Sequence, residues 1–290
     1  MNRNPLFSFK LMLILPALFI LLLFTLYPFI LNIFYSLHNL TVFNFFNPPF
    51  VGLRNYLRIF TSADVFIAVK NTLIYVVAAV TWELILGLVL SQLFSQKFPG
   101  RGILSILVLS PIALAPAVVG YMFLLLFYDL YGIIPALLRL FGFRISILGN
   151  KKVVLAAMIF IDIWEWTPFM FIILFAGMRS IPNELYEAAM TDGASSWEIF
   201  RYITLPLLTP AITVATLFRI IDAFRTFESI YVITGGGPGS ATTTISILVY
   251  RSFTSGKMGI SAALSVLVFI LAFLITQMTH KYLFSRSVAQ

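Results

Sequence analysis

The sequence predicts an all-α, polytopic membrane protein. Of its 290 residues, 60% are hydrophobic and only 10% are charged, and the mean hydropathy is +1.00. The apolar residues form long uncharged runs, most of them near or above the roughly 20 residues that a helix needs to cross a bilayer. A soluble globular protein does not have this composition. We therefore expect a single transmembrane domain over residues 1–290, with six membrane-spanning helices.

The apolar runs place the six spans at about 11–37, 65–94, 103–127, 153–178, 206–233 and 258–280. Arg3 and Lys10 precede the first run, as in a secretory signal, but no small-residue cleavage site interrupts Leu11–Leu37. We therefore expect this segment to remain as a membrane anchor. Several prolines fall within or at the ends of spans, where neighbouring helices can satisfy the freed carbonyl groups.

The composition also argues against several classes of function. The chain has no cysteine, and its two histidines, His38 and His280, lie near the ends of different segments. We therefore expect no disulfide, no thiol nucleophile and no metal site. The net charge of +8 is spread over the loops, which is typical of membrane topology and lipid contact rather than of nucleic-acid binding.

The charge pattern does not orient the protein. Six spans place both termini on one side, and Lys and Arg are divided equally between the loops of the two sides. The positive-inside rule therefore gives no decision.

The longest stretch that cannot lie within a bilayer is Ser180–Pro210. Ser180 is a good N-cap, and Gly193 suits the left-handed end of a short helix through residues 187–189. Ser195 and Glu198 have the spacing of a capping box that starts a second helix, over Trp197–Thr204. This pattern predicts two short helices at the membrane face, and one interpretation is that they are only a connector.

The same stretch resembles the "EAA" loop of bacterial ATP-binding-cassette importer permeases, in the form found in the carbohydrate-uptake subfamily. The resemblance rests on Glu187-Ala-Ala, Asp192-Gly193-Ala194 and the later Phe200, Ile203, Leu205 and Pro206. It implies the type I importer permease fold, with residues 180–205 as a cytoplasmic coupling loop that docks on a separate ATPase subunit. The contact residues implied are Glu187, Ala188, Ala189, Asp192, Gly193 and Ala194. It also implies that both termini are cytoplasmic.

Two further motifs support the resemblance. Residues 50–56 read FVGLRNY, as in the first permease of sugar-importer pairs. The turn Gly235-Gly236-Gly237-Pro238 is similar to the element on which an extracytoplasmic binding protein docks. It lacks the Gly-Lys-Ser/Thr ending of a phosphate-binding loop, and no Walker motif occurs anywhere in the chain. We therefore expect no ATP hydrolysis by this subunit.

Ionisable residues inside the predicted spans are candidates for function, because charge is costly at bilayer depth. Arg219, Asp222, Arg225 and Glu228 form a ladder of alternating sign at helical spacing. One interpretation is that such pairs only hold spans together, and the other is a sugar site. The resemblance implies substrate contacts at Asp162, Glu165, Trp166, Phe169, Arg219, Ala223 and Thr226, and Asp222 of the ladder is a further candidate. Lys70, Asn71, Glu83 and Tyr121 are weaker candidates, for which packing or snorkelling is the favoured explanation.

Taken together, these features predict the inner-membrane permease subunit of a sugar importer that works by alternating access, with a di- or oligosaccharide as substrate. The implied partners are a second, similar permease, two ATPase subunits that bind ATP and Mg²⁺, a solute-binding protein and membrane lipid, with no cofactor or nucleic acid. One alternative is import of a phosphorylated polyol, if Arg219 and Arg225 are unpaired. Others are an ion-coupled transporter, in which the intramembrane acids carry protons, and a structural scaffold.

Overall fold

The computed structural model describes residues 14–287, with side chains up to residue 281. Arg3, Lys10 and the start of the predicted first span at residues 11–13 lie outside the described residues. The described residues divide into two compact units, one formed by residues 14–65 with Leu248–Phe269 and the other by Phe66–Ile247 with residues 270–287. Residues 14–287 contain no β-strand. The prediction of an all-α membrane protein is therefore confirmed.

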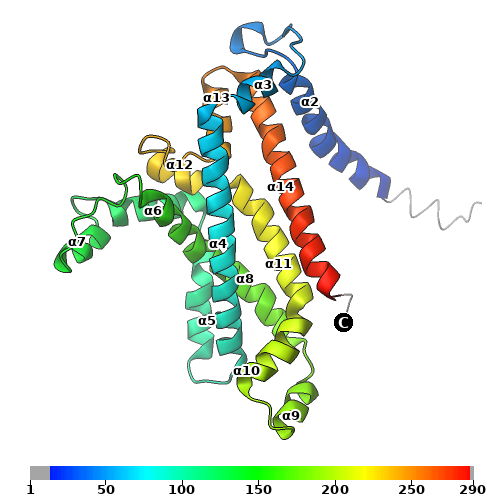
Figure 1. The fold of residues 1–290 in the computed structure, drawn as a ribbon, viewed down its shortest axis with the longest axis vertical. Coiled ribbons are helices and arrows are strands. Elements are labelled where there is room, and N and C mark those ends of the chain that lie inside the picture. Colours follow the sequence, from blue (N-terminus) through cyan, green and yellow to red (C-terminus); the bar gives the residue numbers. More distant parts are fainter. Residues whose placement is uncertain (1–13, 288–290) are drawn as a thin grey trace, which may run out of the picture. The chain divides into compact units, whose positions relative to one another are not determined.

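The helical elements follow one another in a chain of long spans and short connecting helices (Figure 1). In order they are η1 (Leu22–Leu26), α2 (Tyr27–Ser36), η2 (Val42–Asn44), α3 (Arg54–Phe60), α4 (Ala63–Ser95), α5 (Arg101–Leu109), η3 (Ser110–Ala113), α6 (Pro116–Phe127), α7 (Ile133–Leu140), α8 (Val154–Arg179), α9 (Asn183–Thr191), α10 (Ser196–Ile199), η4 (Phe200–Thr204), α11 (Leu205–Arg225), α12 (Glu228–Thr234), α13 (Ile245–Thr254) and α14 (Met258–Ser287).

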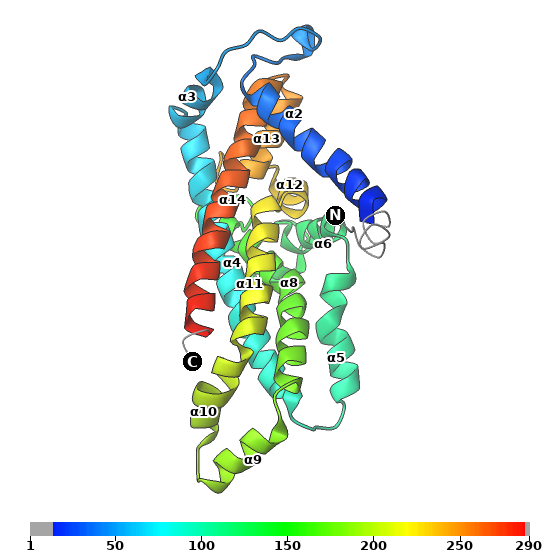
Figure 2. The same ribbon diagram turned by 90° about the vertical axis from the view of Figure 1, so that its right-hand side faces the viewer.

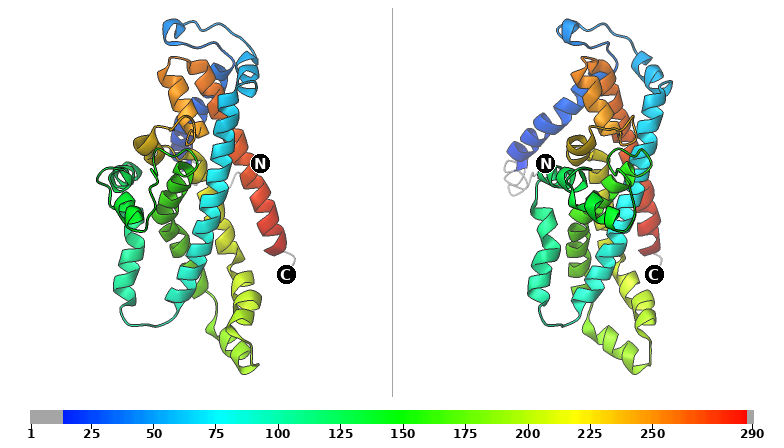
Figure 3. Two further views of the ribbon diagram at one scale, coloured as in Figure 1. Left: turned by 60° about the vertical axis from the view of Figure 1, so that its left-hand side comes forward. Right: turned by 90° about the vertical axis from the view of Figure 1, so that its left-hand side faces the viewer.

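Five segments of the described chain are long and apolar enough to cross a membrane: Ile14–Ser36, Ala63–Ser95, Val154–Arg179, Ser196–Thr234 and Met258–Lys281. The predicted span over 103–127 differs, because Arg101–Ala113 and Pro116–Phe127 are bent by 100° (Figure 3). Pro116 has no amide hydrogen, and the preceding Ala115 is extended, with ψ of 139°. Counted as one broken span, this pair completes the predicted six.

The FVGLRNY segment has a structural role within the first unit. The buried Asn55 side chain donates hydrogen bonds to the carbonyl oxygens of Ser36 (2.8 Å) and His38 (2.9 Å). The Tyr56 hydroxyl lies 2.7 Å from Ser36 Oγ. Gly52 supplies a left-handed turn with φ of +54°. The segment therefore satisfies carbonyl groups that the end of α2 leaves without partners.

In the second unit, α4, α8 and α11 pack together around a continuous apolar core (Figure 2). Small residues permit the close approach of these helices, as is common between membrane helices. A Cβ atom on Gly87 of α4 would lie 2.6 Å from Met170 Cβ of α8. A Cβ atom on Gly177 of α8 would lie 2.8 Å from Leu208 Cδ1 and from Ala211 Cβ of α11.

The second unit has different structures at the two ends of α8 and α11. The short helices α9 and α10 lie at one end, and α6, α7 and α12 lie toward the other (Figures 1 and 2). At the α12 end, Asn71 of α4 donates hydrogen bonds to the carbonyl oxygens of Ser240 (2.9 Å) and Thr243 (3.1 Å). Asn71 thus anchors the loop that follows the glycine-rich turn, as the packing interpretation predicted.

We expect Gly87→Ala to lower the thermal stability of the protein, because the added methyl group would overlap Met170 at the crossing of α4 and α8. Overpacking of this kind costs about 1–3 kcal/mol. Gly102→Ala is the matched control, since Gly102 is also helical and its added Cβ would have no atom within 4 Å. Thermal denaturation of both variants in detergent measures the difference, and equal midpoints would contradict the crossing described here.

Candidate functional site

The first half of the predicted coupling loop is the helix α9 and the turn that ends it. Gly193 has φ of +79°, and Ala194 donates its amide to the carbonyl of Ala189 at 2.9 Å, so the helix ends where predicted. The predicted N-cap, Ser180, was wrong. Its hydroxyl and its amide both donate to the carbonyl of Gly177, which makes Ser180 the end of α8, and α9 begins three residues later, at Asn183.

The second half of the loop begins with the predicted capping box. Glu198 donates its amide to Ser195 Oγ at 3.3 Å, and Ser195 donates its amide to Glu198 Oε2 at 2.8 Å. The predicted separate helix ending at Thr204 was wrong, because α10 continues through the π-helical turn η4 directly into α11. Pro206 lies inside this continuous helix, just after the π-helical turn, where its missing amide hydrogen removes one backbone hydrogen bond.

The predicted ATPase contacts lie in the second half of α9 and in the turn that ends it. No residue of α9 is buried. Glu187, Ala188, Asp192 and Gly193 are exposed, while Ala189 and Ala194 are half-buried. Small side chains beside two carboxylates leave room for the close approach of another protein.

Inside the membrane, the guanidinium group of Arg219 is the centre of a buried charge cluster. Its Nε and Nη2 atoms donate to the two carboxylate oxygens of Glu83 at 2.6 and 2.8 Å. Nη2 also donates to Asp162 Oδ2 at 2.8 Å, and Nη1 donates to Asp222 Oδ2 at 2.7 Å. The guanidinium carbon lies 4.6 Å from the centre of the Trp166 ring. Arg219 itself is only 1% exposed.

This cluster differs from the predicted ladder along one helix. The Arg219–Asp222 rung forms, but α11 ends at Arg225 and α12 begins at Glu228. Among the described side chains, Arg225 and Glu228 form no salt bridge. The main partner of Arg219 is Glu83 of α4. From the sequence, packing was the favoured explanation for the presence of Glu83 in this span. The signal for it was present, because Glu83 is the only charged residue in a long apolar run.

A cavity of about 260 Å³ lies beside the cluster, between α8, α11, α12 and the start of α6. Of the predicted substrate contacts, Asp162, Glu165, Trp166, Asp222 and Thr226 line it. Phe169 packs edge-on against Trp166, with ring centres 6.2 Å apart, and Ala223 is buried in the apolar core. Arg219 is buried and is not one of the residues that line the cavity.

The charge of this cavity is mainly negative. Its lining includes the carboxyl groups of Asp162, Glu165, Asp222 and Glu228, and one cation, Arg225. Carboxylates accept hydrogen bonds from hydroxyl groups, and the face of an indole ring such as Trp166 can pack against apolar C–H groups. The arrangement is therefore suited to a neutral, hydroxyl-rich solute.

The glycine-rich turn, the predicted docking element, is held by threonine side chains. Gly235 and Gly236 have φ values of +55° and +94°, and the Gly237–Pro238 peptide bond is cis. Thr243 Oγ1 donates to the carbonyl of Gly236 at 2.8 Å. The turn follows α12, at the end of the unit away from α9 and α10 (Figure 1).

Comparison with known proteins gives a consistent result. The trehalose/maltose transport system permease protein MalF of Thermococcus litoralis is 40% identical over 261 residues, which cover 90% of this chain and 88% of that protein. The sulfoquinovosyl glycerol transport system permease protein SmoG of Agrobacterium fabrum is 35% identical over 91% of this chain and 87% of its own length. A chain of a bacterial ABC transporter that imports the acidic polysaccharide alginate has the same fold, with a TM-score of 0.82, 23% identity and 95% of both chains covered.

The family match covers the coupling loop, the charge cluster and the glycine-rich turn together. Residues 83–286 match the family described as the inner membrane component of binding-protein-dependent transport systems. With its multiple apolar spans, this chain belongs to that family of membrane-embedded transporter permeases.

Proposed function

We propose that this permease carries a neutral di- or oligosaccharide across the inner membrane, through a central site that includes the cavity between α8, α11 and α12. The observation that carries the proposal is the lining of that cavity, where several carboxyl groups surround the Trp166 ring. Such groups match the hydroxyls and the C–H faces of a sugar. The Thermococcus relative, named for trehalose and maltose transport, supports this substrate class.

Two kinds of role are assigned to the intramembrane charges. Arg219 and Glu83 are both fully buried and satisfy each other through two hydrogen bonds, so their role is to hold α4 against α11. The cavity is lined by Glu165, Thr226 and Glu228. It is also lined by Asp162 and Asp222, each of which forms a salt bridge with Arg219 as well. We assign sugar contact to the lining residues.

A phosphorylated polyol is less well supported as the substrate. That alternative needs two unpaired arginines, but Arg219 is bound to Glu83, Asp162 and Asp222. Arg225 is the one cation in a cavity lining that has four carboxyl groups. A dianionic phosphate would be repelled in this setting, because like charges in a low-dielectric site interact strongly.

The remaining parts of the machine follow from the family. We propose that α9 docks on one of two ATPase subunits, which bind ATP and Mg²⁺, so that this chain makes and breaks no covalent bond and needs no cofactor. A second, similar permease would complete the transport pathway, with Gly235–Pro238 contacting a solute-binding protein outside and both termini in the cytoplasm. Closure of the ATPases would then move α9, and with it the spans, in alternating access.

Charge reversal on α9 tests the coupling assignment. We expect Glu187→Arg to reduce ATP-driven sugar uptake to about one tenth or less of wild type, because loss of an interface anchor costs about 2 kcal/mol or more. Uptake of labelled disaccharide and pull-down of the ATPase measure the two effects.

Glu184→Arg is the matched control, since it makes the same charge change one turn earlier on the exposed face of α9. We expect it to have the smaller effect. Normal uptake and normal ATPase binding by Glu187→Arg would sink the assignment. Uptake that survives ATP depletion but collapses with an uncoupler would instead favour an ion-coupled transporter.

Replacement of a buried glutamate by glutamine, at Glu165 and at Glu83, distinguishes a side chain that contacts the sugar from one that only forms a structural ion pair. We expect Glu165→Gln to raise the KM for sugar uptake about tenfold without lowering thermal stability, as for loss of one charged hydrogen bond. We expect Glu83→Gln to lower the thermal stability and the yield of assembled protein, because glutamine keeps only one of the two oxygens that accept from Arg219, and a hydrogen bond to a charged group contributes about 1.5–3 kcal/mol. A Glu165→Gln protein with unchanged KM would exclude that side chain from the sugar site.

Substrate charge can be tested by competition in proteoliposomes that contain the complete transporter and its binding protein. We expect unlabelled trehalose or maltose to compete with labelled disaccharide, and glycerol phosphate to compete at least about tenfold less well, because of the excess of carboxyl groups in the cavity. Equal competition by glycerol phosphate would support the phosphorylated polyol instead.

A further inference from the structure

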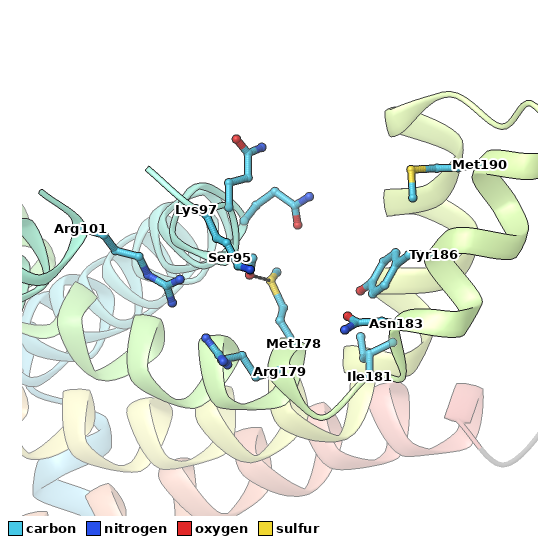
Figure 4. Close-up of a pocket in the computed structure, with 11 residues that line it drawn as sticks. Ser95, Lys97, Arg101, Met178, Arg179, Ile181, Asn183, Tyr186 and Met190 are labelled. Carbon is cyan, nitrogen blue, oxygen red and sulfur yellow. Dashed lines mark hydrogen bonds between the residues drawn. The ribbon is translucent and has the colours of Figure 1, made fainter. Parts of the chain in front are cut away.

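A second cavity, of about 570 Å³, lies where the coupling loop meets the membrane helices. Three cationic side chains line it, each from a different place: Lys97 after α4, Arg101 at the start of α5 and Arg179 at the end of α8. Asn183 and Tyr186 of α9 form the facing wall (Figure 4). The cavity is distinct from the one beside Arg219, because the two share no lining residue.

The positive charge of this cavity is not balanced within the described chain. None of the described residues that line it is acidic, and its three cations form no salt bridge among the described side chains. Arg101 and Arg179 both contact one ring, that of Phe175, with guanidinium carbons 5.1 and 5.7 Å from its centre. Two like charges are thus held near each other, and an anion between them would relieve their repulsion.

The other groups of the lining are mostly hydrogen-bond donors that an anion can use. Gln92, Gln96 and Asn183 carry amide groups, and Tyr186 carries a hydroxyl. Arginine binds phosphate through two parallel hydrogen bonds, and lysine binds it as a point charge. The volume is in the usual range for small-molecule sites, about 300–1,000 Å³, and exceeds what a bare phosphate ion would fill.

We infer that this cavity binds a phosphate ester, which bridges the membrane helices α5 and α8 to the coupling helix α9. The ester can be the head group of an anionic phospholipid or a soluble sugar phosphate, since both offer the same group to Lys97, Arg101 and Arg179. Binding to both walls at once restrains α9 against the end of α8. The ligand therefore changes how ATP hydrolysis is coupled to transport, an effect that rests on the proposed role of α9, whereas binding itself does not.

The test uses the complete transporter, in nanodiscs of phosphatidylcholine alone or with one third phosphatidylglycerol, and in phosphatidylcholine with added glucose 6-phosphate. Retention of the phospholipid is measured by native mass spectrometry, and binding of the sugar phosphate by ³¹P NMR. The ATPase rate stimulated by binding protein and sugar is measured in the same samples. We expect one of the two phosphate esters to bind and to change the ATPase rate several-fold.

The variants are Lys97→Gln and Arg179→Gln, singly and together. Each single variant should weaken phosphate-ester binding about tenfold, as for loss of one charge-assisted hydrogen bond. Arg201→Gln is the matched control, because Arg201 is an exposed cation of the same loop region that does not line the cavity. Lys97 lies on an exposed turn, so its variant is expected to fold even if Arg179→Gln does not.

Each outcome decides one point. Loss of phosphatidylglycerol binding in the variants identifies a lipid site, and loss of glucose 6-phosphate binding identifies a metabolite site. If neither ester binds wild type more tightly than it binds Lys97→Gln, the inference is overturned. Binding that is lost in the variants without any effect on the ATPase rate supports the anion site but contradicts the coupling role of α9.

Discussion

The buried guanidinium group of Arg219 is the interaction on which the second unit depends. A charge at bilayer depth is costly unless it is paired, and here three helices each contribute a carboxyl group: Glu83 from α4, Asp162 from α8 and Asp222 from α11 itself. The planar fork of an arginine can bind all three at once, which a lysine could not do in the same geometry. Removing Arg219 would leave three carboxyl groups without their shared cation, so the cluster specifies how α4, α8 and α11 meet. The cavity beside it has its shape because these helices are fixed there.

The same helices connect the cavity to the coupling loop. α8 carries Asp162 and Glu165 in its first half and ends at Arg179, directly before α9. α11 continues from α10 through η4 without a break and carries Arg219 and Asp222 in its last two turns. Under the proposed coupling, a displacement of α9 and α10 would be transmitted to the central charges through these two helices, which Arg219 links by its bond to Asp162.

How far the sequence predicts this structure depends on the range of the interactions involved. The capping box at Ser195 and the turn at Gly193 were predicted, because each is set by residues a few positions apart. The apolar spans were predicted because each is a local run of apolar residues: the described chain has five, or six if the bent pair is counted as one span. The 100° bend before Pro116 was not, since proline is also tolerated inside membrane helices and only packing decides between the two. The role of Glu83 as the partner of Arg219 was not predicted either, because the two residues are 136 positions apart. Neither was that of Asn55, which satisfies carbonyl groups at the end of a preceding helix.

The cavity beside Arg219 and the cavity lined by Lys97, Arg101 and Arg179 have opposite charge, and this bears on the balance of Lys and Arg across the chain. A rule that counts cations near the ends of spans treats each one as a topological signal. Lys97, Arg101 and Arg179 are instead gathered around one cavity, next to the predicted coupling loop. Such a cluster raises the local positive potential beside the predicted coupling loop. It does so without increasing the number of Lys and Arg residues on that side of the membrane. The equal division of Lys and Arg is therefore compatible with a defined orientation, because what differs between the two sides is where the cations lie and not how many there are.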